Sequence, residues 1–416
     1  MTRGIAKWRT LVAVSMASVL MLLGITMANV ALPEIQRDLD AGFNDLRWVI
    51  DAYALTLAAT ILIAGSLADR IGRLRMFLIG LALFTAASVA CGLASDVLAF
   101  NLFRGVQGIG GAAMFATSLA LIGAAYSGRD RNIALGFWGG ASAGAMAIGP
   151  LVGGILVGAI GWQAIFWFNV PVALVIWWLV SRDVPESRGA PATGPVDVAG
   201  LVCVAGSMTL LVLALFRGDD WGWASAATLG CFAGALILLL VFVAVESRVA
   251  QPLLDLSLFR KPSTTAASLG THGISFSVFA IFTFIALYIQ STLGHSAAGT
   301  GLRIFVLTIF SFVAAVIAGR LAERVSLRVL FTFGMVVIGL GLGLMAVQVE
   351  PSSEWTSLLA GGILVGAGTG VGLFAGSHVA LSAAPRAQSG MAAGLNGAFR
   401  MLGLAVGVAA LGTILG

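Results

Sequence analysis

The sequence predicts an all-α polytopic membrane protein that consists of two related helical bundles. Of its 416 residues, 59% are apolar and 10% are charged, whereas soluble proteins carry about 25% charged residues. Thirteen apolar runs are long enough to cross about 30 Å of hydrocarbon as helices. A basic loop, GSLADRIGRLR at residues 65–75, follows the second run and returns as GRLAERVSLR at 319–328. A loop that recurs between membrane helices indicates an internal duplication.

Each apolar run is predicted to be a helix, because a backbone in lipid must satisfy its own hydrogen bonds. The thirteen predicted transmembrane helices occupy residues 10–32, 47–67, 76–95, 98–125, 133–158, 163–181, 197–216, 224–245, 264–290, 298–319, 329–348, 357–383 and 392–415. The first run is longer than the apolar part of a signal peptide, so it is predicted to be an uncleaved first helix.

Polar stretches divide the chain into three predicted parts. These are an N-terminal six-helix bundle at 1–181, a linker with an inserted two-helix hairpin at 182–263, and a C-terminal bundle of five helices at 264–416. In a plain six-helix repeat the basic loop would follow helices 2 and 8, but its copy follows helix 10, a displacement that the hairpin explains. Two six-helix bundles and a hairpin would make fourteen helices. We therefore expect the last helix to be absent, because the natural protein ends there or because the chain is truncated.

The distribution of positive charge predicts the orientation in the membrane. Seventeen of the 23 Lys and Arg residues fall at the N-terminus and in alternate loops: Arg3, Lys7, Arg9, Arg70, Arg73, Arg75, Arg129, Arg131, Arg182, Arg188, Arg248, Arg260, Lys261, Arg320, Arg324, Arg328 and Arg386. Positive charge accumulates on the cytoplasmic side of membrane proteins. The N-terminus is therefore predicted to be cytoplasmic and the C-terminus of this chain to lie outside. The net charge of +5 reflects topology and predicts no nucleic-acid partner.

The sequence carries no pattern of catalytic or metal chemistry. It has no P-loop, no paired catalytic carboxylates and no Cys/His cluster. Cys91, Cys203 and Cys231 lie inside predicted helices without pairing or metal spacing, which is typical of buried thiols. We therefore expect neither an enzyme nor a metal site, and no cofactor.

The basic loop combines glycines with an acid. Gly65 and Gly72 permit close backbone approach and positive φ, and Asp69 can accept hydrogen bonds from a helix N-terminus or pair with an arginine. The arginines alone would fit simple membrane topology, whereas an Asp between two glycines favours a gate. Glu323 and Ser326 replace the acid and the second glycine in the copy, which predicts a weaker contact. The arginines of the first loop are Arg70, Arg73 and Arg75.

The fifth predicted helix is dense in small residues. Small residues let helices approach closely, and proline removes one backbone hydrogen bond, so this helix is predicted to have a smooth, kinked surface. The residues are Gly144, Gly149, Pro150, Gly153 and Gly154.

Ionisable residues inside the predicted helices are candidates for a substrate or proton pathway. Asp51 in the second helix and Arg104 in the fourth lie near the same outer side. We hypothesise that they share one polar pocket in which Asp51 carries a proton; the alternative is an interfacial Asp51 that caps its helix. Gln107 shares a helix face with Arg104, and Arg400 shares one with Asn396 in the last helix, where both are expected to face protein.

The order of several motifs resembles the fourteen-helix drug:proton antiporter group of the major facilitator superfamily over essentially the whole chain. The motifs are TMANVALP (26–33), WVIDAY (48–53), the basic loop, FRGVQGIGGAA (103–113), GAMAIGPLVGG (144–154), GWQAIFWFNVP (161–171), PLLDLSLF (252–259), YIQSTLGHSAAGTGLR (288–303) and NGAFRMLG (396–403). The resemblance implies the major facilitator fold, with two six-helix-type bundles and an inserted hairpin.

The resemblance also implies roles for residues. The basic loop would latch helix 2 against the opposite bundle in the outward-open state, and the helix 5 motif is one that antiporters carry rather than symporters. Asn29, Tyr53 and Gln290 lie in matching motifs and are added to the pathway candidates. The sequence departs from the family near Gly24, where the family usually has an Asp in helix 1.

The resemblance implies a multidrug-type efflux transporter that exports amphipathic organic compounds or antibiotics by proton antiport and alternating access. Its expected partners are a small amphipathic organic substrate, protons and the lipid bilayer of a bacterial-type plasma (inner) membrane, and the expected state is a monomer. Because Gly24 leaves little negative charge to hold a dication, we expect neutral or weakly charged substrates. The alternatives are a proton-coupled uptake symporter and a non-transporting membrane scaffold or truncated remnant.

Overall fold

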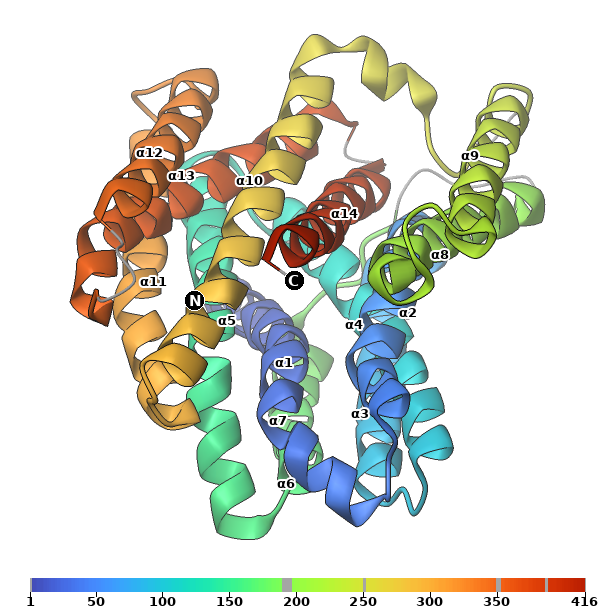
Figure 1. Ribbon diagram of the computed structural model, residues 1–416. Helices are drawn as coiled ribbons and strands as arrows, with labels where there is room; N and C mark the ends of the chain where they lie inside the picture. Colours follow the sequence, from blue (N-terminus) through green and yellow to red (C-terminus); the bar gives the residue numbers. More distant parts are fainter. Residues whose placement is uncertain (1, 189–196, 250–251, 349–352, 386–387, 416) are drawn as a thin grey trace.

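The computed structural model describes residues 2–188, 197–249, 252–348, 353–385 and 388–415, which are almost entirely helical. The first seven helices, blue to green in Figure 1, form the N-terminal bundle. They are α1 (Thr2–Asp38), α2 (Phe43–Ile71), α3 (Arg73–Gly92), α4 (Val97–Ala125), α5 (Gly128–Ile160), α6 (Ala164–Trp167) and α7 (Asn169–Asp183). The short α6 and α7 together correspond to the sixth predicted membrane helix.

A hairpin and a second bundle follow. The hairpin consists of α8 (Val198–Trp221) and α9 (Ala226–Glu246), and a 3₁₀ turn at Leu256–Arg260 leads to the second bundle. The second bundle consists of α10 (Pro262–Leu287), a π-helical turn (Tyr288–Thr292), α11 (Ala297–Leu321), α12 (Leu327–Gln348), a 3₁₀ turn (Trp355–Leu358), α13 (Leu359–Ala383) and α14 (Ser389–Leu415).

When α6 and α7 are taken together, the described helices correspond in order to the thirteen predicted membrane helices, and the fold is all-α. Within the described residues, eleven helices are long and apolar enough to cross a membrane by length and composition, and no strand is present there. Local sequence sets several of the ends. Asp96 caps α4 by accepting the N–H of Ala99 at 2.8 Å, and α2 ends at Gly72, whose φ of 117° is open to glycine.

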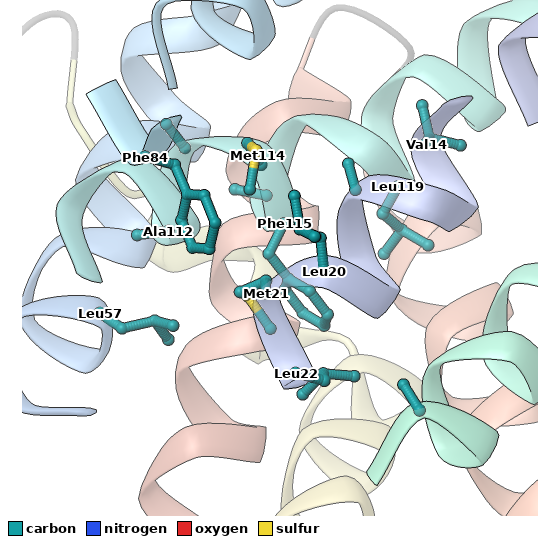
Figure 2. Close-up of a cluster of buried hydrophobic side chains, with 14 of the residues drawn as sticks. Val14, Leu20, Met21, Leu22, Leu57, Phe84, Ala112, Met114, Phe115 and Leu119 are labelled. Carbon is teal, nitrogen blue, oxygen red and sulfur yellow. The ribbon is translucent and has the colours of Figure 1, made fainter. Parts of the chain in front are cut away.

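The largest buried cluster lies where α1, α2, α3 and α4 cross. Figure 2 shows Met21 and Leu22 of α1 beside Phe115 of α4, with Leu57 of α2 and Phe84 of α3 around them. These side chains are almost fully buried. Because lipid tails are as apolar as these residues, close packing rather than the exclusion of water holds such a cluster together in a membrane.

Two helix pairs join the bundles to each other: α2 packs on α14, and α5 packs on α11. Glycines make both contacts possible, because a Cβ built on Gly65 would lie 2.3 Å from the carbonyl oxygen of Gly390, and one on Gly319 would lie 2.6 Å from that of Asn132. The helices α2 and α11 are also the ones that precede the two basic loops. The duplication predicted from the loops therefore corresponds to two equivalent contacts between the bundles.

The α8–α9 hairpin lies beside the α2–α14 pair (Figure 1). Its first helix packs on both α2 and α14. We call the end of the molecule that carries the two basic loops the basic end, and the other end the opposite end. The N-terminus of α14 lies at the basic end, next to the α2–α3 loop.

Candidate functional site

Asp69 joins the two bundles at the basic end. Its Oδ1 accepts the N–H of Gly390 at 3.0 Å, and its Oδ2 accepts the N–H of Met391 at 2.9 Å, both in the first turn of α14. Arg73 donates to the same carboxylate from Nε at 3.0 Å and from Nη2 at 2.8 Å. Both partners that the sequence suggests are thus present. A carboxylate at a helix N-terminus also interacts favourably with the helix dipole. We call these contacts the latch.

The glycines of the loop serve the two purposes expected of them. At Gly65 the backbone of α2 touches the backbone of α14, as described above. Gly72 has a φ of 117°, and a Cβ there would meet the carboxyl group of Glu186 at 2.6 to 2.8 Å. Glu186 itself accepts the N–H groups of Leu74 at 3.0 Å and Arg75 at 3.1 Å, so it caps the start of α3. The segment after α7 therefore braces the loop, a contact that the sequence did not predict.

The second copy of the loop makes a more exposed contact. Glu323 pairs with Arg129 of α5 at 2.8 Å, but their side chains are 34% and 69% exposed. Exposed ion pairs contribute about 0–1 kcal/mol. Beside this pair, Nε2 of His378 in α13 lies 2.6 Å from Oδ1 of Asn132 in α5. The α5 side of the basic end is thus closed by weaker contacts than the latch, as the replacement of Asp by Glu predicts.

The small residues of α5 pack against α1. A Cβ on Gly149 would collide with the side chain of Thr26, and one on Gly153 would lie 3.1 Å from the Cα of Met27. Nothing lies within 4 Å of such an atom on Gly144. The motif thus lets α5 approach α1 within the N-terminal bundle, while the other face of α5 packs on α11.

Arg104 is fully buried in the core of the N-terminal bundle. Its Nε donates to the carbonyl of Val49 at 2.8 Å and its Nη2 donates to the carbonyl of Gly24 at 3.2 Å. Its Nη1 donates to Oε1 of Gln107 at 2.6 Å. The guanidinium lies 4.4 Å from the centre of the Tyr53 ring. The side chain therefore ties α1, α2 and α4 together.

The network continues from Gln107 to two further helices. Nε2 of Gln107 donates to Oγ of Ser88 in α3 at 2.6 Å, and Nδ2 of Asn169 in α7 donates to the same oxygen at 3.0 Å. The hydroxyl of Tyr53 donates to the carbonyl of Met21 at 2.9 Å. Three predicted pathway residues, Tyr53, Arg104 and Gln107, thus lie together in a polar network inside one bundle.

The prediction that Asp51 and Arg104 share one polar pocket is wrong. Asp51 pairs with Nη2 of Arg217 in α8 at 3.4 Å. The hydrogen bonds of Arg104 go instead to two backbone carbonyls and to Gln107. The reason is helical geometry: Asp51 and Tyr53 are two residues apart, about 200° around the helix. Tyr53 faces Arg104, so Asp51 faces the hairpin. Arg217 also lies 3.4 Å from Asp220 and 4.7 Å from the centre of the Trp48 ring.

The ion pair should couple α2 to the hairpin. We expect a double-mutant cycle of Asp51→Asn and Arg217→Gln to give a coupling free energy of about 1 kcal/mol in the thermal unfolding of the purified protein. Arg217→Gln should destabilise more than Asp51→Asn, because Arg217 also neutralises Asp220. Additive effects of the two substitutions would contradict a direct pair.

The remaining predicted residues lie elsewhere. Asn396 and Arg400 of α14 are 3% and 2% exposed, so they face protein as expected. The guanidinium of Arg400 lies 5.5 Å from the centre of the Phe115 ring in α4, between the bundles. Asn29 is exposed on α1, and Gln290 lies in the π-helical turn with a side chain outside the described residues. The predicted pathway residues are therefore spread over at least three places.

The sequence is similar to a known family of membrane proteins over nearly its whole length. The family model described as Major Facilitator Superfamily matches residues 14–260 and 267–416. Multidrug resistance protein Stp of Mycobacterium tuberculosis is 34% identical over 407 residues, which cover 98% of this chain and 75% of the relative. The tetracenomycin C resistance and export protein of Streptomyces glaucescens is 32% identical over 409 residues, covering 98% and 76%.

The fold also matches a solved structure. The crystal structure of the human organic anion transporter MFSD10 superposes with a TM-score of 0.71 at 14% identity, covering 98% of this chain and 93% of that one. At this identity the match concerns the fold alone, two packed bundles of membrane helices.

Proposed function

Because the chain belongs to the Major Facilitator Superfamily, we propose that it exports amphipathic organic compounds or antibiotics by proton antiport. The direction of transport is supported by the relatives, which are named for drug resistance and export. The proposal places the basic end in the cytoplasm, following the distribution of positive charge, and the protein works as a monomer in a bacterial-type inner membrane.

The latch is the observation that carries the proposal. The carboxylate of Asp69 holds the first turn of α14, and the glycines beside it bring two backbones together. Such a contact can open without rebuilding either helix. In this proposal the latch closes the cytoplasmic end in this conformation. When the latch opens, the two bundles rotate and the space between them opens to the cytoplasm. Alternating access needs a contact of this kind between two rigid bodies.

In this proposal Asp51 carries the proton that drives export. Its carboxylate is 19% exposed and pairs with Arg217 near the opposite end, which the proposal places outside. When Asp51 takes up a proton, its ion pair with Arg217 breaks. Arg217 then keeps Asp220 as a partner, so protonation of Asp51 leaves no isolated buried cation. Each proton that enters across 100 mV supplies about 2.3 kcal/mol.

The substrates are neutral or weakly charged. Arg400 places a positive charge between the bundles, beside the aromatic ring of Phe115. A dication would be repelled there, and Gly24 provides no carboxylate to hold it. An aromatic, uncharged or weakly acidic compound suits this surface better.

Reconstituted vesicles test the proposal. Purified protein in liposomes with a trapped pH indicator should move protons when a drug gradient is applied, and Asp51→Asn should abolish this movement. Drug should still bind to Asp51→Asn, which separates loss of coupling from loss of the substrate site. Glu34→Gln, a partly exposed acid of α1, serves as the matched control and should behave as wild type.

Two results would contradict parts of the proposal. Proton movement by Asp51→Asn at the wild-type rate would remove the carrier role from Asp51. The absence of any drug-driven proton movement in wild-type vesicles, with folded protein, would remove proton antiport and favour the scaffold alternative.

A further inference from the structure

Two carboxyl groups lie buried together at the basic end of the α8–α9 hairpin. Asp197 precedes α8 and is 9% exposed, and Glu246 ends α9 and is 4% exposed. A Cβ built on Gly200 would lie 2.3 Å from Oδ2 of Asp197 and 2.9 Å from Oε1 of Glu246, so these two oxygens are at most 5.2 Å apart. Two negative charges at such a distance in a buried place repel each other strongly.

Three of the four carboxyl oxygens of the pair accept hydrogen bonds from the described residues, and one does not. Oδ1 of Asp197 accepts the N–H of Gly200 at 2.9 Å, where it caps α8. Glu246 accepts the N–H of Leu253 on Oε1 at 3.2 Å and that of Leu254 on Oε2 at 3.3 Å. Oδ2 of Asp197 is buried and has no hydrogen-bond partner among the described residues. One proton shared by the two carboxyl groups would remove one of the two charges, and the unpaired Oδ2 of Asp197 lies at most 5.2 Å from Oε1 of Glu246.

The charged groups around the pair do not neutralise it fully. Among the described residues, Asp197 repels Glu246 and Arg70 of α2 attracts it. Asp255 lies in the neighbouring segment, but hydrogen bonds from Ser257 hold its carboxylate and keep the pKa of Asp255 below its usual range. Arg70 thus attracts Glu246, which remains beside a second buried carboxyl group.

The segment that Glu246 holds reaches the latch. Leu253, Leu254 and Leu258 share a hydrophobic cluster with side chains of α2, α8, α9 and α14. The N–H of Asp255 donates to Sδ of Met391 at 3.2 Å, and the N–H of Met391 donates to the latch carboxylate. The carboxyl pair is therefore connected to the first turn of α14 through one short segment.

We infer that Asp197 and Glu246 form a proton-binding site that holds the segment 253–260 against α2 and α14. With one proton shared between them, the two carboxyl groups do not repel each other, and Glu246 keeps both backbone bonds to the segment. When the proton leaves to water at the basic end, the pair carries two charges, Asp197 and Glu246 separate, and the segment loosens beside the latch. The inserted hairpin thereby makes the closure of the basic end depend on pH.

Hydrogen–deuterium exchange of the full chain in detergent micelles with a metal chelator tests the site. After correction for intrinsic exchange, the protection of the Leu253 and Leu254 amides should fall about tenfold between about pH 6 and about pH 9. This is expected because the carboxyl pair binds one proton more tightly when the segment is docked than when it is released. Asp197→Asn removes the negative charge at this position and keeps an acceptor for the N–H of Gly200, so the protection of the two amides should not change with pH. Asp197→Ser keeps the helix cap without the charge and should also be independent of pH.

Asp219→Asn changes an acid at the other end of the same hairpin and should behave as wild type. Wild-type protection that is constant over the pH range would overturn the inference, and so would Asp197→Asn and Asp197→Ser variants that follow the wild-type profile. The measurement involves no substrate and no transport, so its outcome is independent of the export proposal.

Discussion

Gly65→Ala is expected to impair transport severely while leaving the protein folded. The added Cβ would lie 2.3 Å from the carbonyl oxygen of Gly390 and 3.0 Å from the Cα of Gly394, and both are backbone atoms that cannot rotate away. The helices α2 and α14 must therefore separate, and Asp69 must lose its bonds to α14. We expect transport to fall about tenfold or more, which corresponds to about 1.4 kcal/mol or more against the closed state.

A buried thiol can report the opening directly. Ala393 of α14 is 2% exposed, so in a variant whose native cysteines are replaced by serine, Ala393→Cys should react slowly with a polar maleimide. Adding Gly65→Ala should make this reaction several times faster. Gly339→Ala, where nothing lies within 4 Å of the new Cβ, is the matched control and should change neither transport nor labelling. Wild-type transport and labelling in Gly65→Ala would show that the close contact is not needed.

Arg104→Met is expected to destabilise the N-terminal bundle severely. The substitution removes the donor for two buried carbonyls, of Gly24 and Val49, and for the side chain of Gln107. Hydrogen bonds to a charged group contribute about 1.5–3 kcal/mol each, and buried groups left unpaired cost more. We expect a loss of at least about 3 kcal/mol and a lower midpoint of thermal unfolding.

The chain contains its own reporter for this experiment. Cys91 is fully buried in the same bundle, whereas Cys203 and Cys231 lie in the hairpin and are partly exposed. With the two hairpin cysteines replaced by serine, a fluorogenic maleimide follows the exposure of Cys91 on heating, and Arg104→Met should shift the transition down by about 5 °C or more.

Arg303→Met is the matched control for this transition. Arg303 donates to the carbonyl of Gly299 in its own helix and belongs to the other bundle, so its removal should leave the Cys91 transition in place. An unchanged transition in Arg104→Met would mean that the polar network does not stabilise the bundle.

Features that depend on local sequence were predictable. The thirteen helices follow from runs of apolar residues, and the latch follows from an acid placed between two glycines in a loop. Gly72 does adopt positive φ, and Asp69 does accept from a helix N-terminus. The weaker second contact was also foreseeable, since Glu323 and Ser326 replace the acid and the second glycine, and the resulting pair with Arg129 is partly exposed.

Features that depend on which helix faces which were not predictable. Arg217 pairs with Asp51, although they are far apart in the chain and Arg217 falls in a predicted outer loop. His378 reaches Asn132 across the bundles, although a single histidine in a helix gives no signal of its partner. The apolar helices have little amphipathic pattern, because both their faces are covered by lipid or by protein of similar polarity.

The sequence by itself determined that this protein is a duplicated bundle of membrane helices with an inserted hairpin and a gate-like basic loop. It did so because hydropathy, charge and glycine geometry act over a few residues. Only the tertiary structure decided that Arg104 belongs to the core of one bundle, that Asp51 faces the hairpin, and that the hairpin reaches the latch. The physical reason is rotation: two residues on one helix point to opposite sides, and packing alone sets which neighbour each side meets.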